Sequence, residues 1–384
     1  MRFPLRFLAV LIIAFLAVLS GCAAPAPPAP RPLDGSRLKL AWTYASGGPI
    51  NLPPVVAGGV VLVIPQDGPL LALDAKTGGL AWRFDPPQGL WDRALAAADG
   101  QVYVGLKGGL LAALDARSGA LLWQSSLGVE VQAPPAASGG RVYVPSTFVG
   151  PGLAGDPTGQ ARLFALDAKT GESLWSFQAG AYILQTPFID GNQLFTGGSY
   201  ADPQLKVDEG GPMRLYALSV QDGSQRWSYQ STDGYVKAIY AAGGYVSYIA
   251  YTDYLSGLDA ASGKLLWRQE TGNWVPSLSG HQQTLYFGAA NTVVQARAIQ
   301  DGSVIWSYNI PGGSFNYLLG APVRVADDLY CLTQRGDLFA LDAANGSLRW
   351  SQATGVTARV GLSVGPGAIY LGDADGVVYA YSDQ

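Results

Sequence analysis

An internal repeat constrains this chain more than any other feature of its 384 residues. The segment LALDAKTGGLAW at 71–82 recurs along the chain, and in each copy a glycine precedes a tryptophan by four residues. The pairs are Gly78–Trp82, Gly119–Trp123, Gly171–Trp175, Gly223–Trp227, Gly263–Trp267, Gly302–Trp306 and Gly346–Trp350. Since a fixed period indicates one stacked supersecondary unit, we expect a single array rather than unrelated domains.

Each unit predicts four short strands, named A to D in chain order. In the first unit, strand A falls in 52–59, strand B in 60–64, and strands C and D in the segments LLALD and GLAWRF. Asp74 can accept backbone N–H bonds in the C–D turn, and Gly78 can adopt a positive φ without a Cβ clash. The C and D segments are therefore expected to form a hairpin.

The number of units predicts a closed ring. Successive repeat tryptophans, counted from Trp42, are 40, 41, 52, 52, 40, 39 and 44 residues apart. Four-stranded units at this period indicate an all-β, eight-bladed β-propeller of antiparallel blades. Residues 358–383 are expected to supply strands A to C of the eighth blade, and residues 38–44 its strand D. This split blade removes a free sheet edge.

The repeat tryptophans are interpreted as structural residues. A tryptophan in each outermost strand can bury a large ring against the neighbouring blade. The set comprises Trp42, Trp82, Trp123, Trp175, Trp227, Trp267, Trp306 and Trp350. One position of strand C is also small throughout: it is Ala72, Ala113, Ala165, Ala217, Gly257, Ala296, Ala340 and Ala380 in turn. We expect close packing at that position.

The first residues read as an export signal. Arg2 and Arg6 precede thirteen apolar residues, Phe7 to Leu19, a run too short to span a bilayer but typical of a secretory signal. Ser20, Gly21 and Cys22 resemble the lipobox of bacterial lipoproteins, in which the cysteine is acylated; the alternative is a buried cysteine that follows a signal. The expected organisation is a signal peptide at 1–21, a Pro/Ala-rich tether at 22–37 and a propeller at 38–384.

Composition excludes several classes of function. A net charge of -4 and a pI near 5.0 argue against non-specific nucleic-acid binding, which needs a basic face. One histidine, His281, and two cysteines, Cys22 and Cys331, exclude a disulfide framework and a Cys-rich zinc site. Cys331 lies in an apolar run and is expected to be buried. No cofactor or metal site is predicted, although a weak calcium site formed by Asp156, Asp202, Asp208 and Glu209 stays open.

One face of the ring is the candidate for binding. The two long intervals place insertions in the B–C connections at 147–161 and 198–213, and the D–A connections emerge on the same face. The D–A connections are expected to carry Trp91, Tyr182, Tyr235, Trp274, Phe315 and Tyr317, with Arg93 and Arg359 nearby. Aromatic residues with arginine are typical of binding hot spots. The alternative is that these side chains plug the central channel.

The pattern A-L-D-A-x-T-G-x-x-x-W at Ala72–Trp82, with its graded copies over 38–384, resembles the repeat of the pyrroloquinoline-quinone-type eight-bladed propellers. Together with the signal, the lipobox and the tether, it is most similar to the BamB family. That resemblance implies a non-enzymatic, lipid-anchored scaffold, monomeric on its own, on the periplasmic side of the outer membrane. The implied partner is the barrel-forming subunit of an outer-membrane assembly machine.

Two other classes of function remain open. The repeat also resembles that of quinoprotein dehydrogenases, which implies a cofactor in the channel, an adjacent cysteine pair and an acidic calcium site; this sequence has no such cysteine pair. In this reading the channel holds a quinone, a glycan or another small molecule. The chain is alternatively a surface lipoprotein on the outer face of the cell membrane, in an organism without an outer membrane.

Overall fold

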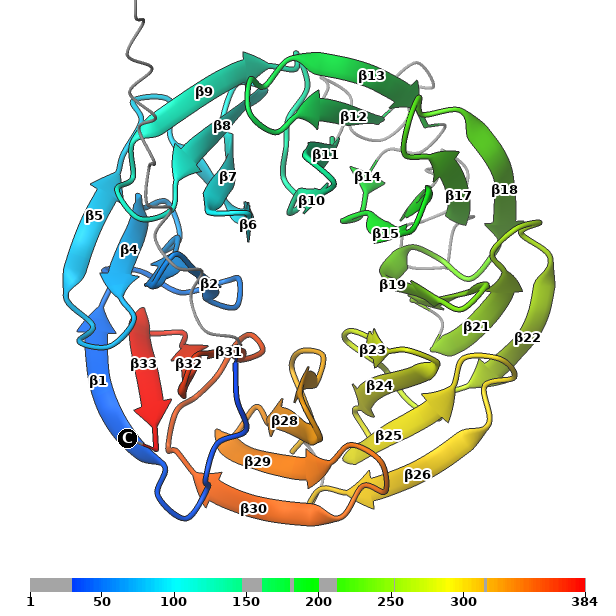
Figure 1. Cartoon of the computed structure of the whole chain (residues 1–384). Helices are drawn as coiled ribbons and strands as arrows, with labels where there is room; N and C mark the ends of the chain where they lie inside the picture. Colours follow the sequence, from blue (N-terminus) through cyan, green and yellow to red (C-terminus); the bar gives the residue numbers. More distant parts are fainter. Residues whose placement is uncertain are drawn as a thin grey trace, which may run out of the picture.

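The computed structural model describes residues 30–146, 161–179, 183–199, 213–251, 253–313 and 316–383. Eight antiparallel sheets follow one another around a ring, as Figure 1 shows, and confirm the predicted all-β propeller. We number the blades 1 to 8 from β2 onward. The described segments contain no helical stretch with the length and hydropathy of a membrane span.

Within each blade, strands A to D are ordered from the centre of the ring outward. The inner A strands are β2 (Val55–Ala57), β6 (Leu90–Ala98), β10 (Ala136–Ser138), β15 (Phe188–Asp190), β19 (Val236–Ala242), β23 (Ser279–His281), β27 (Val323–Val325) and β31 (Ser363–Gly365). The B strands are β3 (Val60–Val63), β7 (Gln101–Leu106), β11 (Arg141–Pro145), β16 (Gln193–Ser199), β20 (Tyr245–Ala250), β24 (Thr284–Ala289), β28 (Asp328–Leu332) and β32 (Ala368–Gly372).

The outer half of each blade is a hairpin of strands C and D. The C strands are β4 (Leu70–Asp74), β8 (Leu110–Asp115), β12 (Arg162–Asp167), β17 (Met213–Ser219), β21 (Tyr254–Asp259), β25 (Val293–Ala298), β29 (Asp337–Asp342) and β33 (Val377–Ser382). The outermost D strands are β5 (Leu80–Phe84), β9 (Leu121–Ser126), β13 (Ser173–Gln178), β18 (Gln225–Ser231), β22 (Leu265–Glu270), β26 (Val304–Asn309), β30 (Leu348–Ala353) and β1 (Lys39–Ala45). Blade 4 has a fifth strand, β14 (Ile183–Leu184), which also pairs with β16.

The predicted split blade is confirmed. Blade 8 has the strand order β1-β33-β32-β31, so the N-terminal strand is its outermost member. Lys39 pairs with Ser382 and Ala45 with Val377, in antiparallel register. In Figure 1, β1 accordingly lies beside β33 at the C-terminal end of the chain.

The repeated C–D turn forms as its residues predict. Asp74 Oδ1 accepts hydrogen bonds from the backbone N–H of Lys76 and Thr77 and from the Thr77 hydroxyl. Gly78 has a φ of 73°. The same position is left-handed in the other six turns, so the glycine is required by backbone conformation in each.

A row of three residues across strands B, C and D builds the core of most blades. In blade 2, Tyr103 pairs with Ala113 and Ala113 with Trp123, and the two ring centroids are 6.0 Å apart. The small Ala113 lets these rings meet above it. In blade 5 the central residue is Gly257, and a Cβ there would collide with the indole of Trp267, which explains the exception at this position.

The repeat tryptophans join neighbouring blades. Seven of them donate a hydrogen bond of 2.9 to 3.2 Å from Nε1 to a carbonyl in the C–D turn of the next blade. Trp227, for example, bonds to the carbonyl of Ala260 and is 8% exposed. These tryptophans therefore make contacts at the seams between blades as well as within them.

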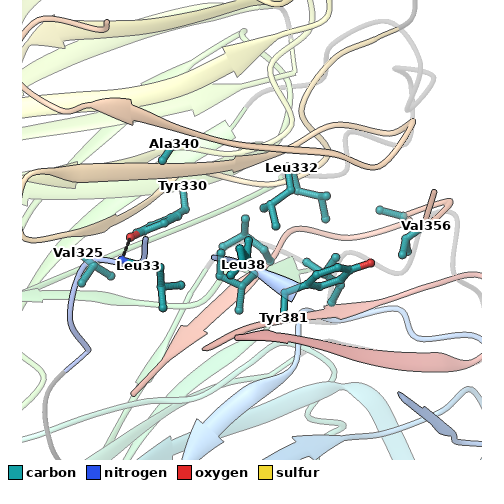
Figure 2. Packing of buried hydrophobic residues seen from close by; sticks show 13 residues of the cluster. Leu33, Leu38, Val325, Tyr330, Leu332, Ala340, Val356 and Tyr381 are labelled. Carbon is teal, nitrogen blue, oxygen red and sulfur yellow. Dashed lines mark hydrogen bonds between the residues drawn. The ribbon is translucent and has the colours of Figure 1, made fainter. Parts of the chain in front are cut away.

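Packing begins before residue 38. Leu33 is 4% exposed and belongs to the same core cluster as Tyr330 and Leu38, as Figure 2 shows. Residues 31–37, expected to belong to the tether, therefore pack against the ring. Residues 1–29 lie outside the described residues, and they include the expected signal peptide, Cys22 and the first part of the expected tether.

Candidate binding surface

The D–A and B–C connections meet on one face of the ring, as expected. The backbone N–H of Tyr251 donates to the carbonyl of Tyr235 at 3.1 Å, and Ala290 donates to Trp274 at 2.8 Å. Gln334 donates to Tyr317 at 3.0 Å. Each bond ties a B–C turn to the D–A connection that precedes it. We call this side of the ring the B–C face and the opposite side, where the C–D turns emerge, the C–D face.

Four aromatic rings gather on the B–C face across blades 5, 6 and 7. The rings of Tyr235 and Tyr251 are 5.2 Å apart, and the edge-to-face pair Trp274–Tyr317 has a centroid distance of 5.9 Å. Tyr235, Tyr251 and Trp274 are 37%, 40% and 36% exposed, although each is in contact with another ring or with Lys237.

Lys237 joins the two ring pairs. Its Nζ lies 5.5 Å from the ring centroid of Tyr251 and 5.3 Å from that of Trp274. The ammonium also donates to the carbonyl of Val275 at 3.2 Å and lies 3.8 Å from Asp253 Oδ1. These contacts define the Lys237 cluster, which consists of Tyr235, Lys237, Tyr251, Trp274 and Tyr317.

The lysine is covered by the rings that it holds. Its side chain is 5% exposed, so burial lowers the pKa of Lys237 by penalising the charged ammonium, while the Asp253 carboxylate opposes that shift. Cation–π contacts of a desolvated ammonium are stronger than exposed ones. Lys237 therefore positions Tyr251 and Trp274 and leaves their outer surfaces open to a ligand.

The cluster has the composition of a binding surface. Rigid, half-exposed rings supply large contact area at low entropic cost, which is the usual composition of a binding hot spot. Among the described residues, no group of three or more His, Cys, Asp or Glu side chains is arranged to hold a metal ion. The thiol of Cys331 is 1% exposed, and burial raises its pKa, so it is not an available nucleophile.

Trp91 occupies a different position from the one expected. It was predicted in a D–A connection with Arg93 nearby, but both residues lie in strand β6, where a register shift separates Leu90 from Leu95. This shift allows an inner strand to form where the sequence suggested a loop. Trp91 Nε1 donates to Glu130 Oε2 at 2.7 Å, and Lys107 lies 5.7 Å from its ring centroid.

The remaining predicted residues are dispersed. Arg93 and Arg359 are exposed in blades 2 and 8 and do not belong to the Lys237 cluster. Tyr182 and Phe315 lie outside the described residues. So do most of the two insertions and the four acidic residues considered for calcium, Asp156, Asp202, Asp208 and Glu209.

Tyr251 and Lys237 were not predicted from the sequence. Tyr251 follows the β20 strand in a short B–C connection, and Lys237 is the second residue of β19. Neither position belongs to the repeat. One feature of the sequence could have indicated Lys237: it lies two positions after Tyr235, so a cation and an aromatic residue are close together.

The fold and this surface define a class of protein: a closed propeller that presents a rigid aromatic patch on one face. The sequence profile of the family described as outer membrane protein assembly factor BamB matches residues 33–127, 72–182, 107–239 and 201–384. Together these matches cover nearly the whole chain. The chain belongs to this family of repeat propellers.

Individual relatives are distant. An outer membrane protein assembly factor BamB from Moranella endobia is 26% identical over 235 residues, which cover 56% of this chain and 58% of that protein. The chain thus spans less than two thirds of the length of this relative. A polyvinylalcohol dehydrogenase from a Pseudomonas species is 24% identical over 91% of this chain and 62% of that enzyme.

A solved structure has the same fold. The crystal structure of BamB from Moraxella catarrhalis superposes with a TM-score of 0.64 and 19% identity, over 90% of this chain and 97% of that one. At this identity the likeness shows the fold, and the function must be argued from the site.

Proposed function

We propose that this protein is a non-catalytic, lipid-anchored scaffold that assists assembly of outer-membrane β-barrel proteins and captures its protein partner through the Lys237 cluster. Family membership supports the assembly role. The signal segment and the lipobox-like Ser20–Gly21–Cys22 support export and acylation of Cys22 to give an anchor at the periplasmic side of the outer membrane. The proposed partner is the barrel-forming subunit of the assembly machine.

The exposed rings around Lys237 carry the proposal of protein binding. Three of them are more than a third exposed, yet each is fixed by a ring contact or by the lysine. Their connections are tied by backbone hydrogen bonds to a closed ring, so little order has to be gained on binding. Such a surface suits a protein partner with apolar and aromatic side chains.

The test is co-purification of the barrel-forming subunit from membranes. A Trp274→Ala, Tyr317→Ala double variant is expected to weaken binding of that subunit by at least about thirtyfold and so to reduce its recovery, since removal of one hot spot typically costs about 2 kcal/mol. Leu348→Ala, an exposed apolar residue of β30, serves as the matched control. Unchanged recovery in the double variant would show that another surface is used.

Trp91 is a second candidate and is separable from the first. It lies in blade 2 with Lys107 and Glu130, away from blades 5 to 7. Trp91→Ala is therefore tested alone. If only this variant loses the partner, the binding surface belongs to blade 2.

The dehydrogenase relative makes a small-molecule function the second candidate. The described residues do not supply an acidic cluster for calcium, and the sequence has no adjacent cysteine pair. Absorbance spectra with and without added pyrroloquinoline quinone and calcium separate the candidates. A saturable spectral change would favour ligand binding in the channel.

A further inference from the structure

The seam between blades 7 and 8 is built differently from the other seven. Elsewhere, a C–D turn provides a carbonyl for the preceding tryptophan and a glycine beneath its ring. Blade 8 has no such turn, because its strands C and D are the two ends of the chain. Accordingly, Trp350 Nε1 is buried without an acceptor among the described residues.

Residues 31–37 occupy the place of the missing turn, and we call them the N-terminal clasp. Gly35 packs against the indole of Trp350 so closely that a Cβ would overlap the ring. Leu33 is buried, and its backbone N–H donates to the Tyr330 hydroxyl at 2.7 Å; Figure 2 shows this bond within the surrounding core.

An ion pair closes the clasp. Arg31 binds the Asp383 carboxylate with both terminal nitrogens, at 2.8 and 2.6 Å, and the backbone N–H of Asp34 donates to the same group at 2.9 Å. The Asp383 side chain is 4% exposed, and the hydrogen bonds from Arg31 lower its pKa. A bidentate pair of this kind fixes direction as well as distance.

The clasp determines where the chain leaves the ring. Ala45, at one end of β1, lies beside the B–C turn of blade 8, because Ser46 N–H donates to the Gly376 carbonyl. Lys39, at the other end, pairs with Ser382, next to Asp383. The clasp is therefore on the C–D face, opposite the Lys237 cluster.

We propose that the N-terminal clasp orients the propeller on the membrane, so that the C–D face is turned toward the bilayer and the Lys237 cluster is presented to partners in the aqueous phase. This inference rests on the proposed anchor at Cys22. Arg31 lies nine positions after Cys22, and a chain of that length reaches about 30 Å at full extension. The clasp fixes the point on the C–D face where this short link to the membrane begins. The Lys237 cluster, on the opposite face, is then farther from the lipid by the thickness of the ring.

The test compares two dyes on the same blade of the acylated full-length protein in lipid nanodiscs. Ala344, in the C–D turn of blade 7, and Gln334, in its B–C turn, are both exposed and are replaced singly by cysteine. Cys22 carries the acyl chain and Cys331 is buried, so neither competes for the dye. Energy transfer to an acceptor in the lipid headgroups is measured, and mass spectrometry confirms acylation.

Higher energy transfer from position 344 than from position 334 is expected. An Arg31→Ala, Leu33→Ala variant should reduce this difference while its circular dichroism spectrum shows an intact fold, whereas Ser36→Ala, at an exposed position of the clasp, should retain it. Equal or reversed transfer in the acylated protein overturns the orientation and leaves the proposed function intact. Absence of acylation at Cys22 overturns the anchor and, with it, the orientation.

Discussion

The indole ring of Trp42 covers Gly78, which lies in the C–D turn of the next blade. A Cβ at Gly78 would lie 2.5 Å from the Trp42 ring, and the glycine has a φ of 73°. The same pairing recurs at the six seams that follow, from Trp82 with Gly119 to Trp306 with Gly346. The glycine of each repeat therefore makes room for the tryptophan of the preceding blade as well as turning its own hairpin.

Gly78→Ala is expected to destabilise the protein by about 2 to 5 kcal/mol, the sum of left-handed backbone strain and overpacking. The matched control is Gly59→Ala in the same blade, where φ is 87° and no atom lies within 4 Å of the Cβ position. That variant should cost about 1 kcal/mol, from backbone strain alone. Urea denaturation measures both values, and equal costs would refute the seam interpretation.

Trp306→Phe should destabilise the protein more than Trp350→Phe does, by about 1 kcal/mol. Both substitutions remove part of a ring at the same repeat position. Only Trp306 loses a hydrogen bond, to the Ala343 carbonyl, because Trp350 Nε1 has no acceptor among the described residues. Thermal and urea unfolding of the two variants test the difference. A larger loss for Trp350→Phe would contradict the assignment of the eighth seam.

Leu33→Ala tests whether the clasp contributes to the closure of the ring. Leu33 is 4% exposed within the core cluster of blades 7 and 8, so its truncation should cost about 2 to 4 kcal/mol. Leu40→Ala, at a residue of β1 that is 51% exposed, should change the free energy of unfolding by less than about 0.5 kcal/mol. Hydrogen exchange should quicken in β1 and β33 of the first variant only. A similar effect in both variants would show that the clasp does not stabilise the ring.

Acid should destabilise the propeller through its C–D turns. Hydrogen bonds from Ser224 lower the pKa of Asp222 to about 2, and bonds from turn residues lower the pKa values of Asp74, Asp115 and Asp167. Between the folded pKa and the unfolded value of 3.8, the unfolded state binds more protons. The stabilisation is thus fully present above about pH 4 and is lost as the pH falls toward 2.

Urea titrations at several pH values measure this effect. Asp222→Asn should flatten the dependence below pH 4, because it removes the carboxyl whose pKa is lowered to about 2. A wild-type stability that is constant between pH 5 and pH 2 would exclude this role for the turns.

The C–D hairpins could be predicted because their causes are local, the blade count because the repeat is periodic, and the split blade because the two ends of the chain carry complementary halves of one repeat. The Asp74 carboxylate bonds to residues two and three positions ahead, and alternating apolar residues define each strand. Because the repeat is periodic, the same blade structure forms eight times, and the blades together form a ring. The repeat also helped to find part of the candidate surface, because Trp274 stands out as a tryptophan that the repeat does not explain.

Only the tertiary structure decided local strand register and the contacts between residues far apart in the sequence. Lys237 meets Trp274 from another blade, and no periodicity marks either position. A register shift placed Trp91 on a strand, and Arg31 bonds to Asp383 across 352 positions of sequence. Such contacts depend on how the closed ring of blades brings distant side chains together. The sequence by itself therefore determined the blades and their turns, whereas ring closure decided which residues meet at the seams and on the B–C face.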